Sequence, residues 1–128
     1  YEAEWEYACQ AGAEGKAYHF GNDIGMRDDH MWYDKNSHGR SELVAQKKPN
    51  RWGLYDMHGN VREWCKDWYA EYPEGPAKNP RGPGEGEQRV IRGGDYSSNF
   101  ITTRTTFRAS AEPKAEGGNL GFRVVLEP

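Results

Sequence analysis

The sequence predicts an α+β fold with little regular secondary structure, in which an N-terminal helix accompanies short, twisted antiparallel strands. Two observations support this class. Sixteen glycines and seven prolines recur along the 128 residues, which disfavours long helices. The apolar side chains include five Trp, eight Tyr and four Phe, so a compact, largely aromatic core is expected. The length fits one domain, residues 1–128.

Charge and composition exclude several classes of function. The 17 basic and 20 acidic residues give a net charge of −3, so there is no electrostatic case for a nucleic-acid partner. No apolar run approaches the length that spans a bilayer, and no membrane insertion is expected. Cys9 and Cys65 allow one disulfide at most, and both a bridge and two free, half-buried thiols stay open.

The first residues predict a helix. Residues 1–11 are strong helix formers, and Trp5, Ala8 and Cys9 fall on one face. Gly12 is expected to end the helix. No capping residue precedes Tyr1, so the helix is expected to start before this chain does.

Residues 12–50 carry no clean periodicity. The run Asp28-Asp29-His30 invites a metal site, but adjacent side chains diverge, and a solvated loop is the favoured interpretation. Residues 31–33 (Met-Trp-Tyr) are expected in the core. Residues 42–46 predict a short strand.

Residues 53–64 are unusually dense in glycine, carboxylates and aromatic side chains. Gly53, Gly59 and Asn60 mark unusual backbone dihedrals. The residues from Val61 to Tyr69 then predict a strand. A turn rich in oxygen ligands before an aromatic strand indicates either a cation site or a tightly hydrogen-bonded corner.

The C-terminal half predicts strands separated by loops. Residues 73–86 are rich in Pro and Gly and predict an irregular surface loop. Residues 88–92 predict a strand. Residues 95–106 are expected to be extended, because four Thr disfavour a helix there. Residues 120–126 predict a buried closing strand.

Four motifs in this order closely resemble the formylglycine-generating enzyme / sulfatase-modifying factor family, from residue 2 to about residue 126. They are Glu2-Ala3-Glu4-Trp5-Glu6-Tyr7-Ala8, residues 53–61 with Glu63-Trp64, Arg89-Val90-Ile91-Arg92-Gly93-Gly94, and Gly121-Phe122-Arg123. The resemblance implies a C-type-lectin-like fold. It also implies that the chain is the C-terminal portion of the full family domain, completed by a missing N-terminal segment or by another chain.

The resemblance implies an oxidase chemistry that the residues here do not support. The family converts a Cys or Ser of a sulfatase to formylglycine with O₂ and copper held by two cysteines. The matching positions are Ser98 and Thr103. Asp95 stands where the family has an active-site Ser, and Arg62 where it has Trp. Copper(I) needs soft thiolate ligands, so copper is not expected and a non-catalytic domain is favoured.

The resemblance also implies a structural calcium site. Its ligands map onto the Asp56 and Glu63 side chains and the backbone carbonyls of Gly59 and Val61. Hard oxygen ligands in a turn suit calcium. The alternative is that Asp56 caps the turn while Glu63 pairs with an Arg or Lys.

Other charged residues are expected to serve the scaffold. Arg suits buried, bidentate pairing with carboxylates, which is predicted for Arg92, Arg104, Arg108 and Arg123. His58 is expected to fix the corner, and the remaining histidines are scattered along the sequence.

The favoured function is therefore binding of a protein or peptide ligand. Its expected binding surface corresponds to the family's active-site face, and comprises Arg62, Asp95, Ser98, Asn99, Thr102 and Thr103. The alternative is an enzyme of the family, either a formylglycine-generating oxidase or a relative of the iron-dependent sulfoxide synthases, with its remaining catalytic parts outside this chain. An accessory module of a larger bacterial protein, such as a kinase-linked one, is a third option.

Overall fold

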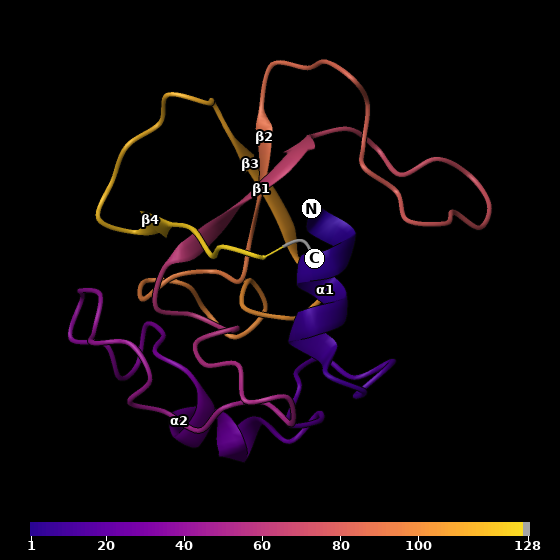
Figure 1. The fold of residues 1–128 in the computed structure, drawn as a ribbon. Helices are drawn as coiled ribbons and strands as arrows, with labels where there is room; N and C mark the ends of the chain where they lie inside the picture. The colour runs from indigo at the N-terminus through magenta and orange to yellow at the C-terminus, as the bar shows by residue number, and fades with distance from the viewer. Residues whose placement is uncertain (127–128) are drawn as a thin grey trace.

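The computed structural model describes residues 1–126 and confirms the α+β class (Figure 1). Its elements are few and short, and long loops join them. In chain order they are α1 (Glu2–Gln10), the 3₁₀ turn η1 (Ile24–Met26), α2 (Arg27–His30), β1 (Arg62–Trp68), β2 (Arg89–Arg92), β3 (Arg108–Ala111) and β4 (Leu120–Gly121).

The four strands form one sheet in the order β3-β2-β1-β4. β2 pairs antiparallel with both β1 and β3, and Ile91 lies opposite Trp64 on one side and Ala109 on the other. β4 instead runs parallel to β1, with Gly121 opposite Glu63. The antiparallel expectation is therefore wrong for this one edge strand, because the chain crosses from β3 to the far side of β1 before forming β4.

Helix α1 packs beside the sheet, and residues 12–60 form a loop-rich layer at one end of it (Figure 1). The first turn of α1 is capped from a distance, because the Asp67 carboxylate accepts the Glu2 N–H at 2.6 Å. A side chain near the end of β1 thus supplies an acceptor to the first turn of the helix. The helix ends at Gln10. Its C-cap Ala11 adopts the left-handed conformation (φ 45°), and Gly12 follows with a positive φ at the predicted C′ position.

Two small clusters of buried side chains form the core. One lies between α1 and the sheet and the other within the loop layer, and their members are Trp5, Cys9, Met57, Cys65 and Val90 in the first and Tyr18, Met31 and Tyr33 in the second. Both thiols are free and buried. The core is less aromatic than predicted, since Trp5 is the one tryptophan buried within residues 1–126.

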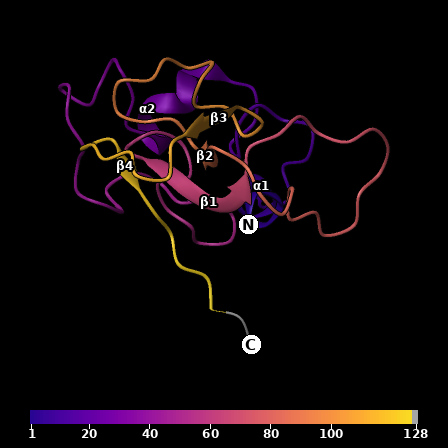
Figure 2. The ribbon, with the colours of Figure 1, turned by 90° about the horizontal axis from the view of Figure 1, so that it is seen from above.

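Three predicted strands are wrong in whole or in part. Residues 42–46 form no strand and turn at Val44 and Ala45, and residues 95–106 form a series of turns in place of an extended segment. The buried closing strand is limited to β4, while Phe122 and Leu126 are 77% and 93% exposed. The chain beyond β4 leaves the body of the molecule (Figure 2). The predicted loop at Asp28-Asp29-His30 belongs to α2.

Candidate functional site

The loop of residues 95–103 is organised around the Asp95 carboxylate, which is fully buried. One carboxylate oxygen accepts the Ser97 N–H at 2.8 Å and the Ser97 and Ser98 hydroxyls at 2.7 and 3.2 Å. The other accepts the Asn119 amide at 2.9 Å and pairs with Arg62 Nε at 2.8 Å. Asp95 therefore ties the loop to β1 and to the chain before β4.

The electrostatics of this loop favour a charged Asp95. Burial alone would raise the pKa of its carboxyl, but the Ser97 hydrogen bonds and the Arg62 charge outweigh it and lower that pKa below the ordinary value. Asp95 stays ionised at neutral pH, and the loop keeps its shape through a charge-assisted network.

The backbone around this loop is also tightly constrained. Gly94 has φ +69°, and a Cβ there would lie 2.7 Å from the Thr102 carbonyl oxygen. Only glycine allows the chain to turn into the loop while the two segments approach this closely.

The structure separates the predicted binding surface into buried and exposed members. Asp95 and Thr103 are fully buried, and Ser98 is 5% exposed. Ser98 Oγ accepts the Asp95 N–H at 2.9 Å, and Thr103 Oγ1 donates to the Asn99 and Phe100 carbonyls at 3.3 Å. These three side chains support the loop from below and are not available to touch a partner.

The exposed part of the loop carries a mixed polar and apolar tip. Asn99 is exposed, and Arg62 and Thr102 are partly so. Sequence reasoning missed Phe100 and Ile101, which are 38% and 48% exposed next to Asn99. They are adjacent large apolar side chains in an otherwise mostly polar loop, and this is the signal that would have singled them out.

One side of this tip is braced by α2. The Arg27 guanidinium lies 5.1 Å from the centre of the Phe100 ring and 5.4 Å from that of Tyr33. The Tyr18 hydroxyl donates to the Phe100 carbonyl. The exposed tip is thus held on a fixed base.

Three histidines that look scattered in the sequence meet beneath the loop. The ring centres of His19 and His30 are 4.9 Å apart, and those of His19 and His58 are 5.1 Å apart. The fully buried His58 donates from Nδ1 to the Thr103 carbonyl at 2.7 Å, and its Nε2 accepts the His19 N–H at 3.2 Å. This confirms His58 as a scaffold residue and adds a cluster that no spacing in the sequence reveals.

The histidine cluster is held uncharged by its surroundings. Burial, with a smaller contribution from His19, lowers the pKa of His58 to about 3. Burial and the neighbouring His30 lower the pKa of His19 to about 4. No group of three His, Cys, Asp or Glu side chains within residues 1–126 is arranged to hold a metal ion.

The Glu63 end of the predicted calcium site is already occupied by protein donors. Glu63 Oε1 accepts Arg123 Nη2 at 2.7 Å, and Oε2 accepts Arg123 Nε at 3.1 Å and Trp5 Nε1 at 2.7 Å. Arg123 Nη2 also donates to the Tyr55 carbonyl at 2.8 Å. Glu63 thus pairs with an arginine here, and calcium would have to exchange with Arg123.

The Asp56 end fits a cation better. Its Oδ2 accepts the Ala45 N–H at 2.8 Å, while its Oδ1 is buried without a hydrogen-bond partner. A buried carboxylate oxygen without a partner is costly, and a bound cation would satisfy it. The predicted set of Asp56, Gly59, Val61 and Glu63 therefore fits calcium only if Arg123 withdraws.

Of the other arginines predicted to pair with carboxylates, two form ion pairs among the described residues and one does not. Arg92 pairs with Glu2 and Glu6 at 2.5 Å each, and Arg108 pairs with Glu2 at 2.7 Å, as expected. Arg104 is exposed and forms no ion pair within residues 1–126, so its predicted pairing is wrong.

Comparison with known proteins identifies the family. The family model described as the sulfatase-modifying factor enzyme 1-like domain matches residues 1–128. The chain belongs to this family. A member in Streptomyces coelicolor, a formylglycine-generating enzyme, is 38% identical over 138 residues, covering 95% of this chain and 44% of the enzyme.

The chain is also similar to proteins with other names. A serine/threonine-protein kinase pkn1 of Chlamydia pneumoniae is 37% identical over 95% of this chain and 20% of the kinase. Among solved structures, Treponema denticola variable protein 1 superposes with a TM-score of 0.88 and 36% identity, over 94% of this chain and 44% of that one. The chain thus spans less than half the length of each of these relatives. Within residues 1–126, no helix is long and apolar enough to cross a membrane.

Proposed function

We propose that this sulfatase-modifying-factor-like domain is a non-catalytic recognition domain that binds a protein or peptide through the exposed tip of the 95–103 loop. We define the recognition tip as Arg62, Asn99, Phe100, Ile101 and Thr102. The observation that carries the proposal is the use of Ser98 and Thr103. The two positions that resemble the family's copper cysteines bear buried hydroxyls that hold this loop in place.

The composition of the recognition tip suits a protein partner. Aromatic and arginine side chains are enriched in protein interfaces, and the tip combines both with amide and hydroxyl groups. Because Asp95 and the histidine cluster fix the loop from below, little backbone entropy is lost when the tip binds. The chain is similar to a variable protein and to a protein kinase as well as to formylglycine-generating enzymes, and this range of relatives supports a role other than oxidation.

The experiment is a selection of displayed peptides against the purified domain, followed by affinity measurements on the enriched peptides. Ile101→Ala and Asn99→Asp are expected to weaken binding by about tenfold or more while the melting temperature stays constant, since Asn99→Asp keeps the Oδ1 that accepts the Ile101 and Thr102 N–H groups. Arg104→Ala, an exposed change just beyond the tip, is the matched control. Peptides that bind these tip variants as well as the unchanged domain would refute the proposal.

The alternative is a family enzyme whose remaining catalytic parts lie outside residues 1–128. The similarity to a formylglycine-generating enzyme supports it. Copper- or iron-dependent turnover of a Cys-containing sulfatase peptide by the full-length protein would establish this alternative, and its absence with a metal-loaded sample would favour recognition.

We further propose that calcium, when bound, is structural and is held by the Asp56 and Glu63 side chains and the carbonyls of Gly59 and Val61. The buried Asp56 Oδ1, which has no hydrogen-bond partner, supports this calcium site. Calcium binding would cost the free energy of breaking the contacts between Arg123 and Glu63.

A further inference from the structure

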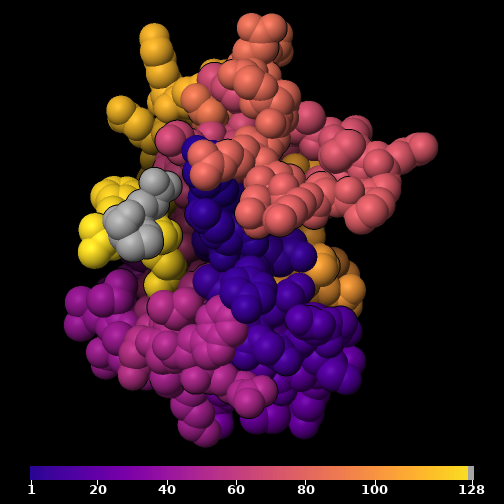
Figure 3. All heavy atoms as spheres, turned by 45° about the vertical axis from the view of Figure 1, so that its right-hand side comes forward, coloured from indigo at the N-terminus to yellow at the C-terminus, as the bar shows by residue number. Residues whose placement is uncertain are grey.

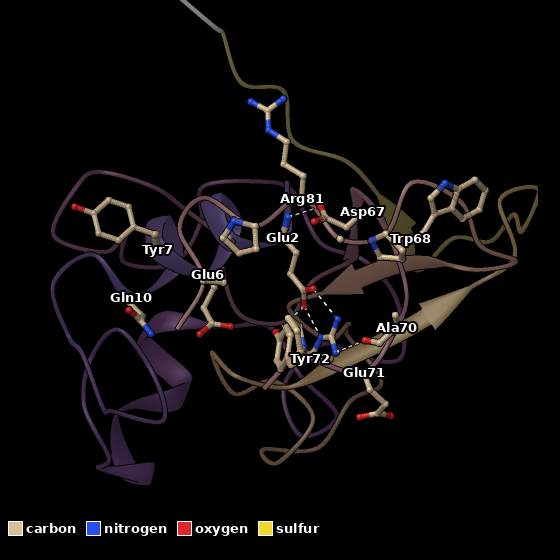
Figure 4. A pocket seen from close by; sticks show the side chains of 17 residues that line it. Glu2, Glu6, Tyr7, Gln10, Asp67, Trp68, Ala70, Glu71, Tyr72 and Arg81 are labelled. Carbon is tan, nitrogen blue, oxygen red and sulfur yellow. Dashed lines mark hydrogen bonds and ion pairs between the residues drawn. The ribbon is translucent and has the colours of Figure 1, made fainter. Parts of the chain in front are cut away.

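A separate groove lies between α1 and the segment that follows β1, and none of its lining residues belongs to the recognition tip (Figure 4). Its volume is about 730 Å³, within the usual range of ligand sites. In Figure 3 the segment around residue 80 overhangs the indigo helix. We call it the proline groove, because Pro73, Pro80 and Pro83 line it.

One wall of the proline groove is a single face of α1. Ala3, Glu6, Tyr7 and Gln10 line it at helical spacing. Tyr7 is 64% exposed, and its ring centre lies 4.9 Å from that of Trp52 in an edge-to-face arrangement. A large, exposed aromatic ring on a helix is a ready contact for an apolar partner.

The opposite wall contains the aromatic ring of Tyr72 and three prolines. Tyr72, 60% exposed, stands over the floor, with the Arg108 guanidinium 3.8 Å from its ring centre. The three prolines fix their own φ angles, so the loop can stay open without collapsing onto α1. Gly86 lets the same loop return against β1, since a Cβ there would lie 2.9 Å from Trp68 Cβ.

Among the described residues, the proline groove has one exposed carboxylate that forms no ion pair, and it belongs to Glu71. Glu2 and Glu6 are neutralised by Arg92 and Arg108. Asp67 is buried and its Oδ2 accepts the Glu2 N–H, so it is not available to a ligand. Glu71 is exposed, lines the groove and forms no ion pair within residues 1–126. At one end, the lining residue Arg81 is engaged by Tyr1, with its guanidinium 4.5 Å from the ring centre and a hydrogen bond to the hydroxyl.

We propose that the proline groove binds an extended, proline-containing segment of a partner protein that carries a Lys or Arg side chain. Proline-rich segments adopt a preformed polyproline II helix and dock into grooves lined by aromatic rings. Tyr7 and Tyr72 supply such rings. The basic side chain pairs with the exposed Glu71 carboxylate, which forms no ion pair within residues 1–126. This site is distinct from the recognition tip and does not depend on it.

The test is fluorescence anisotropy of a labelled peptide that alternates proline and alanine around one arginine. It is compared with a peptide in which Arg is replaced by Glu and with one in which every Pro is replaced by Ala. We expect each replacement to weaken binding about tenfold or more, and higher salt to weaken the parent peptide. Tyr7→Ala and Glu71→Lys are expected to weaken it similarly. Both side chains are exposed, so the fold should be kept.

Ile101→Ala, on the recognition tip, is the matched control and should leave this affinity unchanged. The proposal is overturned by an absence of binding up to about 1 mM peptide, by equal binding of the proline-free peptide, or by full affinity in both Tyr7→Ala and Glu71→Lys. Because the tip variants and the groove variants are measured separately, failure of either site leaves the other standing.

Discussion

At positions 98 and 103, the hydroxyls of Ser98 and Thr103 have a different function from the thiols expected of a copper site. A thiolate is a soft metal ligand, whereas a hydroxyl is a good hydrogen-bond donor and acceptor. Here both hydroxyls bond to their own loop. These positions therefore stabilise the shape of the loop, and the residues exposed at its tip carry recognition.

Asp95→Asn is predicted to destabilise the domain by roughly 2 kcal/mol, because it removes a buried charge from Arg62 and places an amide against the Asn119 amide. Urea unfolding of both proteins at pH 7 measures it. Asp34→Asn, an exposed carboxylate next to Lys35, should change stability by less than about 0.5 kcal/mol. Equal effects of the two changes would show that the Asp95 network is not stabilising.

Arg123 and calcium are predicted to compete for Glu63. Arg123→Met should raise the affinity for calcium, because Glu63 Oε1 then has no partner and Oε2 keeps only Trp5. Calorimetric calcium titration of the two proteins measures it. Glu63→Gln should abolish the binding in either background. Calcium binding that Glu63→Gln leaves intact would place the ion elsewhere.

At the scale of elements, helix α1 and the strand after residue 61 follow directly from the sequence, because their periodicity and β-branched or aromatic residues are local signals. The failures occur where the outcome depends on distant partners. The Thr-rich segment after Asp95 forms turns because its side chains bond within the loop, which overrides their preference for strands. Residues 122–126 have a strand-like pattern but no neighbouring strand to pair with among the described residues.

The corner before β1 brings the backbone of Gly59 against the backbone of Trp32. Gly59→Ala should prevent folding, since a Cβ would lie 1.9 Å from the Trp32 carbonyl oxygen, which accepts the Asn60 N–H. Gly53→Ala is the matched control, because Gly53 also has a positive φ but no atom within 4 Å of an added Cβ. It should cost only about 1 kcal/mol. Circular dichroism and thermal melting distinguish the two, and a stable Gly59→Ala protein would contradict this geometry.

At the scale of the whole molecule, the family motifs predict the fold, yet they do not predict which site residues are exposed. Asp95, Ser98 and Thr103 were expected on a binding surface and lie under it, because burial depends on how the 33–37 and 119 segments close over the loop. The histidine cluster and the proline groove arise in the same way, from segments remote in sequence. The sequence predicts which residue types occupy the site, but it does not predict which of them become buried by segments that are remote along the chain.

The histidine cluster makes the whole molecule sensitive to acid. His58 and His19 titrate near 6.5 when unfolded, and burial lowers their folded pKa values to about 3 and about 4. The unfolded chain therefore binds more protons below pH 6.5, so stability is full above that pH and falls as the pH drops toward 4. At pH 5, His58 alone should cost about 2 kcal/mol. Urea midpoints between pH 7.5 and 4.5 measure the slope. His19→Gln should reduce it, whereas the exposed His38→Gln should not, and a pH-independent midpoint would show that the cluster already accepts protons in the folded state.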